Sequence, residues 1–323
     1  MTQSKLLVGI DIGGTKTAVV LSHQPPEVLA RAEFATLPAK GPQQSLNQIK
    51  KSVRELLAEK EWEPGAVMRI GVSCGGPLDR VQGIIQSPPN LPTWENIPLK
   101  SILEDEFKVE CLVENDANAG AVAEHRFGAG QGCQSMVFLT MGTGLGAGII
   151  TDGRLYRGAN DLAGEIGHVR LTRSGPIGHN KAGSAEGWAS GGGMAQLAAQ
   201  SVAEAQRKGK KSLLADHIRT GKPITAREVG AAARKGDVVA IEILRSTGER
   251  LGEVLAILTD VLNPERIVVG GLAMRLGDFL LEPARRVMQR EALPQTASVC
   301  QVVPAALGES IGDVAALAVA MGI

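Results

Sequence analysis

Residues 5–21 read KLLVGIDIGGTKTAVVL, and this stretch decides the fold. An apolar run from Leu6 to Ile12 includes one carboxylate, Asp11, and stops at Gly13-Gly14. A second, β-branched run follows over residues 15–21. Two apolar runs separated by a short glycine turn are typical of a β-hairpin. We therefore predict strand, tight turn and strand, with Asp11 near the turn.

The same pattern recurs at residues 135–151, SMVFLTMGTGLGAGIIT. Two hairpins of one design indicate two related half-domains. Glycines let a backbone approach a ligand closely, and turn N–H groups beside a hydroxyl or an ammonium form an anion-binding concavity. The pair predicts a phosphate held between the hairpins; the alternative is that the glycines serve only the turns. The candidate residues are Gly13, Gly14, Thr15, Lys16, Gly142, Thr143 and Gly144.

Two other phosphate-binding motifs are excluded by the sequence. The chain contains no G-x-x-x-x-G-K-[ST] loop. Residues Gly142, Gly144 and Ala147 loosely match the dinucleotide fingerprint, but that fingerprint must open a helix. Here the following residues, 148–151, continue as a strand, so a Rossmann interpretation fails.

Composition limits the class of protein. A length of 323 residues suggests two domains, and 34 basic residues balance 34 acidic ones. A balanced charge favours neither nucleic acid nor a membrane surface as partner, and no apolar run reaches the roughly 20 residues of a membrane span. The four scattered cysteines form no C-x-x-C pair and follow no signal peptide, which predicts a cytoplasmic protein.

Hydrophobic periodicity and turn residues predict the remaining elements. Strands are expected at 28–36, 67–74, 109–113, 267–269 and 299–303, and helices at 42–60, 99–107, 116–127, 194–207, 225–235, 238–262, 276–289 and 310–321. Residues 87–99 are too rich in proline for regular structure, and the glycine-rich residues 174–193 are expected to be a loop.

Several polar residues lie where ligands are commonly bound. Asp116 follows a predicted strand and opens a helix, at the carboxyl edge of a sheet. Its alternative role is that of helix N-cap, which Asn115 or Asn118 could equally fill. Glu165 and His168 are three residues apart, so they could converge on one ligand. Asn90 and Asn96 in the proline-rich segment could bind a polyhydroxylated ligand or simply cover an edge.

These segments together resemble the ROK family, a group of sugar kinases and repressors with the actin-like ATPase (ribonuclease H-like) fold. The resemblance runs nearly end to end. Its motifs are DIGGTK at 11–16, GGP at 75–77, PNLPTWENIPL at 89–99, ENDANA at 114–119, GTGLGAGI at 142–149, E-x-G-H at 165–168 and VGG at 269–271.

The resemblance implies an α/β protein of two lobes with a nucleotide cleft between them. The small lobe would comprise residues 1–118 and 308–323, and the large lobe residues 119–307. Asp116 would be the general base on the sugar hydroxyl, and Asp11 would position Mg²⁺ through water. The other hydroxyls would be held by Gly76, Asn90, Asn115, Glu165, His168 and Glu186. Gly13–Lys16 and Gly142–Gly144 would cradle the phosphates of ATP, with Gly270 and Gly271 beside the adenosine.

One segment departs from the family pattern. Many members carry C-x-C-G-x-x-G-C-x-E after the E-x-G-H histidine, whereas residues 177–186 here read IGHNKAGSAE. A structural zinc site requires four N/S ligands, and this segment with His168 offers two histidines. We therefore predict no zinc, with Glu186 retained as a sugar contact.

The resemblance thus implies an ATP-dependent, Mg²⁺-requiring hexose kinase, most like a glucokinase acting on the 6-hydroxyl, and a homodimer. Fructose, mannose, allose or an N-acetylhexosamine are alternative substrates. A sugar-sensing transcriptional regulator is a rival from another class, but its helix-turn-helix would precede a first strand that here starts by Lys5. A sugar-binding protein without turnover is the third possibility, and Asp11, Lys16 and Asp116 argue against it.

Overall fold

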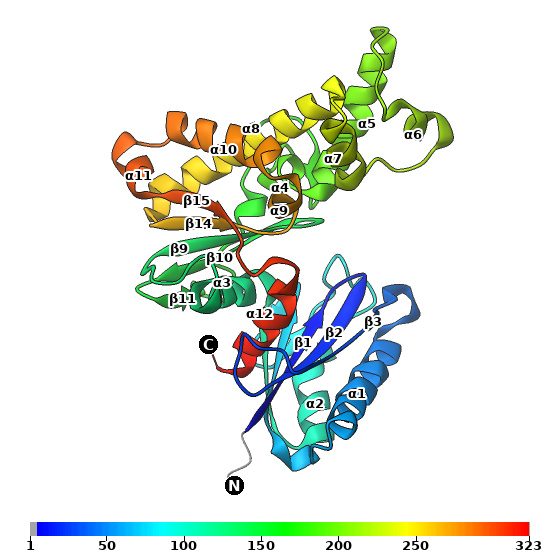
Figure 1. The fold of residues 1–323 in the computed structure, drawn as a ribbon, viewed down its shortest axis with the longest axis vertical. Coiled ribbons are helices and arrows are strands. Elements are labelled where there is room, and N and C mark those ends of the chain that lie inside the picture. Colours follow the sequence, from blue (N-terminus) through cyan, green and yellow to red (C-terminus); the bar gives the residue numbers. More distant parts are fainter. Residues whose placement is uncertain (1–4, 323) are drawn as a thin grey trace. The chain divides into compact units, whose positions relative to one another are not determined.

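The computed structural model describes residues 5–322, which divide into two compact units (Figure 1). The first contains the residues up to Gln131 together with those from Leu307 onward, and the second is Gly132–Ala306. This division places residues 119–131 in the first unit, whereas the sequence analysis assigns them to the large lobe. The functional lobe boundaries stay a prediction.

The first unit is built on a five-stranded sheet of order β3-β2-β1-β4-β8. Strands β1 (Leu6–Ile12), β2 (Lys16–Ser22) and β3 (Ala30–Ala35) form an antiparallel meander, which confirms the predicted hairpin. Strands β4 (Val67–Cys74) and β8 (Glu110–Asn115) then add in parallel to β1. The carboxyl ends of β1, β4 and β8 therefore meet at one edge of the sheet.

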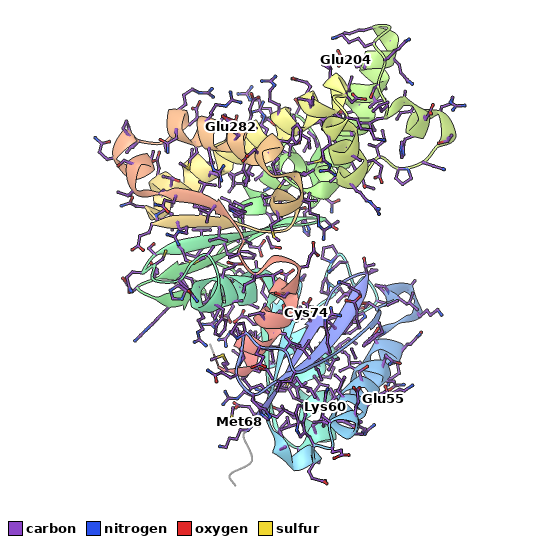
Figure 2. The ribbon with its side chains drawn as sticks, viewed as in Figure 1. Glu55, Lys60, Met68, Cys74, Glu204 and Glu282 are labelled. Atoms are coloured by element: carbon purple, nitrogen blue, oxygen red, sulfur yellow. The ribbon has the colours of Figure 1, made fainter. Side chains whose placement is uncertain are left out.

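Helices cover both faces of this sheet. On one face α1 (Pro42–Glu59) and α2 (Leu99–Phe107) pack their apolar residues against the alternate β1 residues Leu6, Val8, Ile10 and Ile12. Glu55 on α1 and Lys60, which directly follows α1, are exposed to solvent (Figure 2).

The other face is covered by α3 (Asp116–Phe127) and α12 (Ile311–Ala320). A Cβ added at Gly71 would lie 2.1 Å from the backbone nitrogen of Ala320, and one at Gly9 would lie 3.0 Å from that of Leu317. The backbone of α12 therefore lies directly on β1 and β4, which requires glycine at both positions.

Short elements complete the first unit. The 3-10 helices are η1 (Pro38–Lys40), η2 (Pro64–Ala66) and η4 (Gly308–Ser310), and a small antiparallel sheet contains β5 (Leu78–Asp79), β6 (Ile84–Ile85) and β7 (Ile97–Pro98).

The second unit repeats the sheet design of the first, with order β11-β10-β9-β14-β15. Strands β9 (Met136–Met141), β10 (Leu145–Thr151) and β11 (Arg154–Tyr156) are antiparallel neighbours, whereas β14 (Arg266–Val269) and β15 (Gln301–Pro304) are parallel to β9. The prediction of two related half-domains is confirmed.

The helices of the second unit include the 25-residue α8, which packs along α10 (Figure 1). A Cβ at Gly248 or Gly252 of α8 would lie 2.5 Å from a carbonyl oxygen of α10, so these helices approach closely. The helices of this unit are α4 (Ala185–Trp188), α5 (Gly191–Arg207), α6 (Ala215–Thr220), α7 (Ala226–Arg234), α8 (Val238–Leu262), α9 (Leu272–Leu276), α10 (Asp278–Glu291) and α11 (Pro294–Val299), with the 3-10 helix η3 (Ile166–His168).

Three predictions for this unit were wrong in detail. The helix expected at 276–289 is α10, which begins at Asp278 after Gly277 (φ 57°), and the short α9 just before it was not predicted. Val299, expected in a strand, ends α11. The loop expected at 174–193 contains a hairpin of β12 (Ile177–Gly178) and β13 (Lys181–Ala182), helix α4 and the start of α5. Within residues 5–322, no helix is long and apolar enough to cross a membrane.

Candidate active site

The turn of the first hairpin brings two predicted groups of site residues together. The N–H of Gly13 donates to the carbonyl of Lys16 at 3.0 Å, which closes the turn. A Cβ at Gly14 would lie 2.8 Å from both the Cβ and the carbonyl oxygen of Asn90. The predicted phosphate turn therefore lies against the segment that carries a predicted sugar residue.

Asp11 lies among carboxylates at the end of β1. Burial, followed by the negative charges of Asp116 and Asp313, raises the pKa of Asp11 to about 7, against a hydrogen bond from Ser73 and the charge of Lys16, which lower it. A cation placed beside Asp11 would offset this repulsion.

Asp116 is the first residue of α3, directly after β8, and its side chain is exposed. Asn115, not Asp116, is the N-cap: its Oδ1 accepts from the N–H of Ala117 at 2.9 Å and of Asn118 at 3.4 Å. Asn115 also lies beside Gly76, where an added Cβ would be 3.2 Å from Asn115 Nδ2. The helix is thus capped without requiring the Asp116 carboxylate, although one of its oxygens also accepts from the N–H of Ala117.

A chain of ion pairs connects the first hairpin to α12. Lys16 Nζ lies 2.9 Å from Glu33 Oε2, and the same oxygen accepts from Arg31 Nη2 at 2.6 Å. Arg31 Nε in turn donates to Asp313 Oδ2 at 2.7 Å. No sequence pattern predicted these three residues, Arg31, Glu33 and Asp313, because residues 31 and 313 are far apart in the chain.

In the second unit, Glu165 precedes the 3-10 helix η3 and His168 is its last residue, and both are exposed. The His168 ring packs edge-on against that of His179, with centroids 4.7 Å apart. Lys181 Nζ donates to the carbonyl of His168 at 2.7 Å. The β12–β13 hairpin therefore lies beside this segment, and convergence of Glu165 and His168 on one ligand stays a prediction.

Glu186 contacts the turn of the second hairpin. It lies on α4, and its Oε2 accepts from the N–H of Leu145 at 3.2 Å. A Cβ at Gly144 would lie 2.6 Å from the same oxygen, and one at Gly167 would lie 3.4 Å from Glu186 Cβ. The structure therefore brings Glu186, the E-x-G-H segment and the predicted phosphate turn together within the second unit.

Backbone contacts also hold this second turn. Gly142 N–H donates to Gly144 O at 3.0 Å, while the N–H groups of Gly191 and Gly192 donate to the carbonyls of Gly142 and Thr143. After the neighbouring strand β14, a Cβ at Gly271 would lie 2.2 Å from the carbonyl oxygen of Met141, just before the turn. Gly270 and Gly271 thus lie beside the β9 end of the turn.

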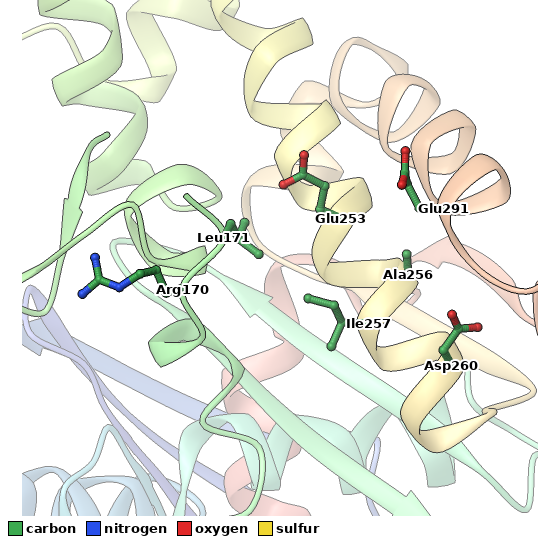
Figure 3. Close-up of a pocket in the computed structure, with 7 residues that line it drawn as sticks. All are labelled: Arg170, Leu171, Glu253, Ala256, Ile257, Asp260 and Glu291. Atoms are coloured by element: carbon green, nitrogen blue, oxygen red, sulfur yellow. The ribbon is translucent and has the colours of Figure 1, made fainter. Parts of the chain in front are cut away.

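A separate pocket of about 300 Å³ lies on the second unit (Figure 3). It is lined by Arg170, Leu171, Glu253, Ala256, Ile257, Asp260 and Glu291. Asp260 Oδ1 accepts from the N–H of Leu293 and the hydroxyl of Thr296. The predicted site residues do not line this pocket.

Within the described part of the chain, no three His, Cys, Asp or Glu side chains are grouped as ligands for a metal ion. His168 and His179 are the two histidines that the sequence places in the segment where many relatives carry cysteines. The expectation of no zinc stays a prediction.

Comparison with known proteins identifies the family. The ROK family model matches residues 7–322. A glucokinase of Halalkalibacterium halodurans is 33% identical over 307 residues, covering 94% of this chain and 92% of the relative. The xylose repressor of Caldicellulosiruptor bescii is 28% identical over 288 residues, covering 88% of this chain and 70% of the repressor. The chain belongs to the ROK family.

A solved structure supports the same assignment. The crystal structure of a ROK family glucokinase from Streptomyces griseus, in complex with glucose and AMPPNP, is 32% identical, with a TM-score of 0.80. The match covers 98% of this chain and 99% of that one. The predicted fold class, the α/β actin-like ATPase fold, is confirmed, and the chain is similar to the sugar kinases of the family.

Proposed function

We propose that the protein is an ATP-dependent hexose kinase that phosphorylates glucose at its 6-hydroxyl. The observation that carries this proposal is the nearly full-length similarity to glucokinases, one of which binds glucose and AMPPNP. Fructose, mannose, allose or an N-acetylhexosamine remain alternative substrates, because one or two pocket residues decide among such sugars.

Asp116 is the proposed general base. Its carboxylate is exposed at the start of α3, where Asn115 fills the N-cap role, and a carboxylate is a suitable acceptor for a hydroxyl proton. The proposed partners of the other hydroxyls are the Gly76 backbone, Asn90, Asn115, Glu165, His168 and Glu186. Carboxylates and amides suit this role because their hydrogen bonds to hydroxyls are directional and, for carboxylates, charge-assisted.

The two glycine turns are the proposed phosphate-binding segments. Gly13–Lys16 supplies N–H groups, a hydroxyl and an ammonium, and Gly142–Gly144 supplies N–H groups and a hydroxyl. Gly270 and Gly271 are proposed to lie beside the adenosine. In phosphoryl transfer the protein mainly positions groups and neutralises charge, which these donors do.

Mg²⁺ fits the proposed role of Asp11. The raised pKa of Asp11 reflects burial and neighbouring carboxylates, a charge distribution that a hard cation would stabilise. Mg²⁺ usually keeps several waters and takes one or two carboxylates plus substrate phosphates, so an all-protein cage is not needed. Asp11 would hold it through water, and bound Mg²⁺ would neutralise phosphate charge.

We also propose that the protein is a cytoplasmic homodimer. Within the described residues no cysteine forms a disulfide and all four are buried, which is typical of a reducing compartment; they are Cys74, Cys111, Cys133 and Cys300. Light scattering on the purified protein tests the dimer.

The test is coupled ADP release from ATP and Mg²⁺ with a panel of hexoses, using wild type and Asp116→Asn. We expect turnover of one preferred hexose and a loss of about 10²-fold or more in the variant. Asp105→Asn, which alters an exposed carboxylate on α2, is the matched control and should equal wild type. Equal rates for wild type and Asp116→Asn would refute the base assignment.

A sugar-responsive regulator without turnover is the second candidate, favoured by the similarity to the xylose repressor. Hexose binding measured by calorimetry, with no ADP release and a shift of genomic DNA fragments on gels, would support it over the kinase.

A further inference from the structure

Helix α4, which carries Glu186, depends on its surroundings for its position. It spans only Ala185–Trp188, and so short a helix is not stable by itself. The Ser184 hydroxyl caps it by accepting from the N–H of Gly187 at 3.1 Å. The orientation of the helix must therefore come from backbone and side-chain contacts with the rest of the unit.

Trp188 supplies the first of these contacts. Its indole Nε1 donates to the Thr172 hydroxyl oxygen at 2.7 Å, and that hydroxyl donates to the carbonyl of Ser174 at 2.7 Å. A Cβ at Gly175 would lie 2.4 Å from the indole ring. The ring thus fixes the loop 172–175 and is itself fixed by it.

Arg250 of α8 supplies the second contact. Its guanidinium carbon lies 5.0 Å from the centroid of the Trp188 ring, within the range of a cation–π interaction. Arg250 Nη1 also forms an ion pair with Glu253 Oε1 at 2.6 Å. The indole therefore contacts both the loop 172–175 and α8, the longest helix of the unit.

These contacts limit the movement of Glu186, which lies two residues before Trp188. Its backbone cannot shift freely toward α5, because a Cβ at Gly193 would lie 1.7 Å from the carbonyl oxygen of Gly187. Its carboxylate accepts from Leu145 N–H at the second turn. A rotation of α4 would move the carboxylate off this donor.

We propose that Thr172, Trp188 and Arg250 form a positioning clamp for Glu186, and that this clamp sets hexose affinity. The inference rests on the proposed function, because it assigns Glu186 to the hexose. The three clamp residues act through α4 and touch no reacting atom. None of the family-like motifs in the sequence includes Thr172 or Arg250.

The experiment compares Trp188→Phe, which keeps a ring but loses the indole donor, and Thr172→Val, which keeps the shape but loses the hydroxyl. Thr172→Ser keeps the hydroxyl and is the rescue variant. Trp62→Phe, a half-buried tryptophan of the first unit, is the matched control. The readouts are KM for hexose and for ATP, kcat, and hydrogen exchange in peptides covering residues 180–190.

We expect Trp188→Phe and Thr172→Val to raise the KM for hexose about three- to tenfold, with the KM for ATP within twofold of wild type. Exchange at 180–190 should accelerate in both, and Thr172→Ser and Trp62→Phe should match wild type. A merely structural role would lower the active fraction and leave the KM for hexose unchanged.

The experiment distinguishes failure of the kinase proposal from failure of the clamp proposal. If the wild type turns over no hexose, the kinase proposal is wrong. Wild type with turnover, but with an unchanged hexose KM in Trp188→Phe, overturns the clamp. Unchanged exchange at 180–190 in all variants overturns it as well, whatever the activity.

Discussion

The turn between β1 and β2 and the turn between β9 and β10 share a backbone design but differ in what surrounds them. Asp11, with its raised pKa, and Lys16, paired with Glu33, flank the first turn. The second turn is approached by the carboxylate of Glu186, which accepts from a backbone N–H. The same glycine hairpin is thus flanked by charged side chains in one unit, and in the other it donates a backbone N–H to a carboxylate.

Among the substitutions that test this difference between the two turns, Asp11→Asn should have the largest effect. We expect a loss of about 10²-fold or more in kcat, because the charge near the proposed metal is removed. The stability of the folded variant should, in contrast, exceed that of wild type at neutral pH. The unfolded carboxyl ionises near pH 4, whereas the folded one keeps its proton to about pH 7, so wild-type stability falls as pH rises between these values.

The Asn variant cannot ionise. Its thermal midpoint should therefore match wild type near pH 4 and exceed it at pH 8, when both are measured without nucleotide or metal. A midpoint below that of wild type at pH 8 would contradict the view that Asp11 is a costly group retained for function.

Alanine at corresponding turn glycines gives the next largest effect. Gly14→Ala pushes against the Cβ and backbone of Asn90, so we expect about 1–3 kcal/mol lower unfolding free energy in urea. Gly144→Ala meets only the flexible end of Glu186, so stability should change little while the hexose KM rises about tenfold.

Gly142→Ala is the control within the second turn, because an added Cβ there meets no atom within 4 Å. It should leave stability and the KM for hexose unchanged and alter the KM for ATP. If Gly14→Ala and Gly144→Ala proved equally destabilising, the two turns would be equivalent and the comparison would fail.

The smallest effect is expected for Glu33→Gln, which removes the partner of Lys16. The Lys16 and Glu33 side chains are 60% and 36% exposed, and ion pairs of this kind contribute little to stability. We expect kcat within about twofold of wild type and an unchanged urea midpoint. A large loss of kcat, rescued by high salt, would show that Lys16 must be held in place.

The sequence predicted those elements whose pattern is local. The bounds of β1 and α8, and α1 to within one residue, follow from apolar runs or helical spacing bounded by turn residues. Helix α6 and the two-residue strands were missed, because elements so short carry no periodicity. Helix α9, of five residues, was missed for the same reason.

The sequence predicted candidate site residues only where they belong to short contiguous motifs. Each motif is contiguous, so its residues could be named, and the structure shows that Asn90 lies at Gly14 and Glu186 at Gly144. The Arg31–Asp313 pair joins residues 282 positions apart, and the Trp188–Thr172 bond depends on the path of a loop. Such pairings come from tertiary packing, so no local pattern indicates them.

The placement of α12 bears on the order in which the chain acquires its structure during synthesis. The first unit contains the earliest described residues, yet one face of its sheet is covered by α12, which is synthesised after the whole of Gly132–Ala306. The second unit is contiguous and can complete its packing as it emerges. The sheet face that carries Gly9 and Gly71 therefore stays uncovered until α12 is synthesised. A nascent-chain chaperone would have to shield this face until then.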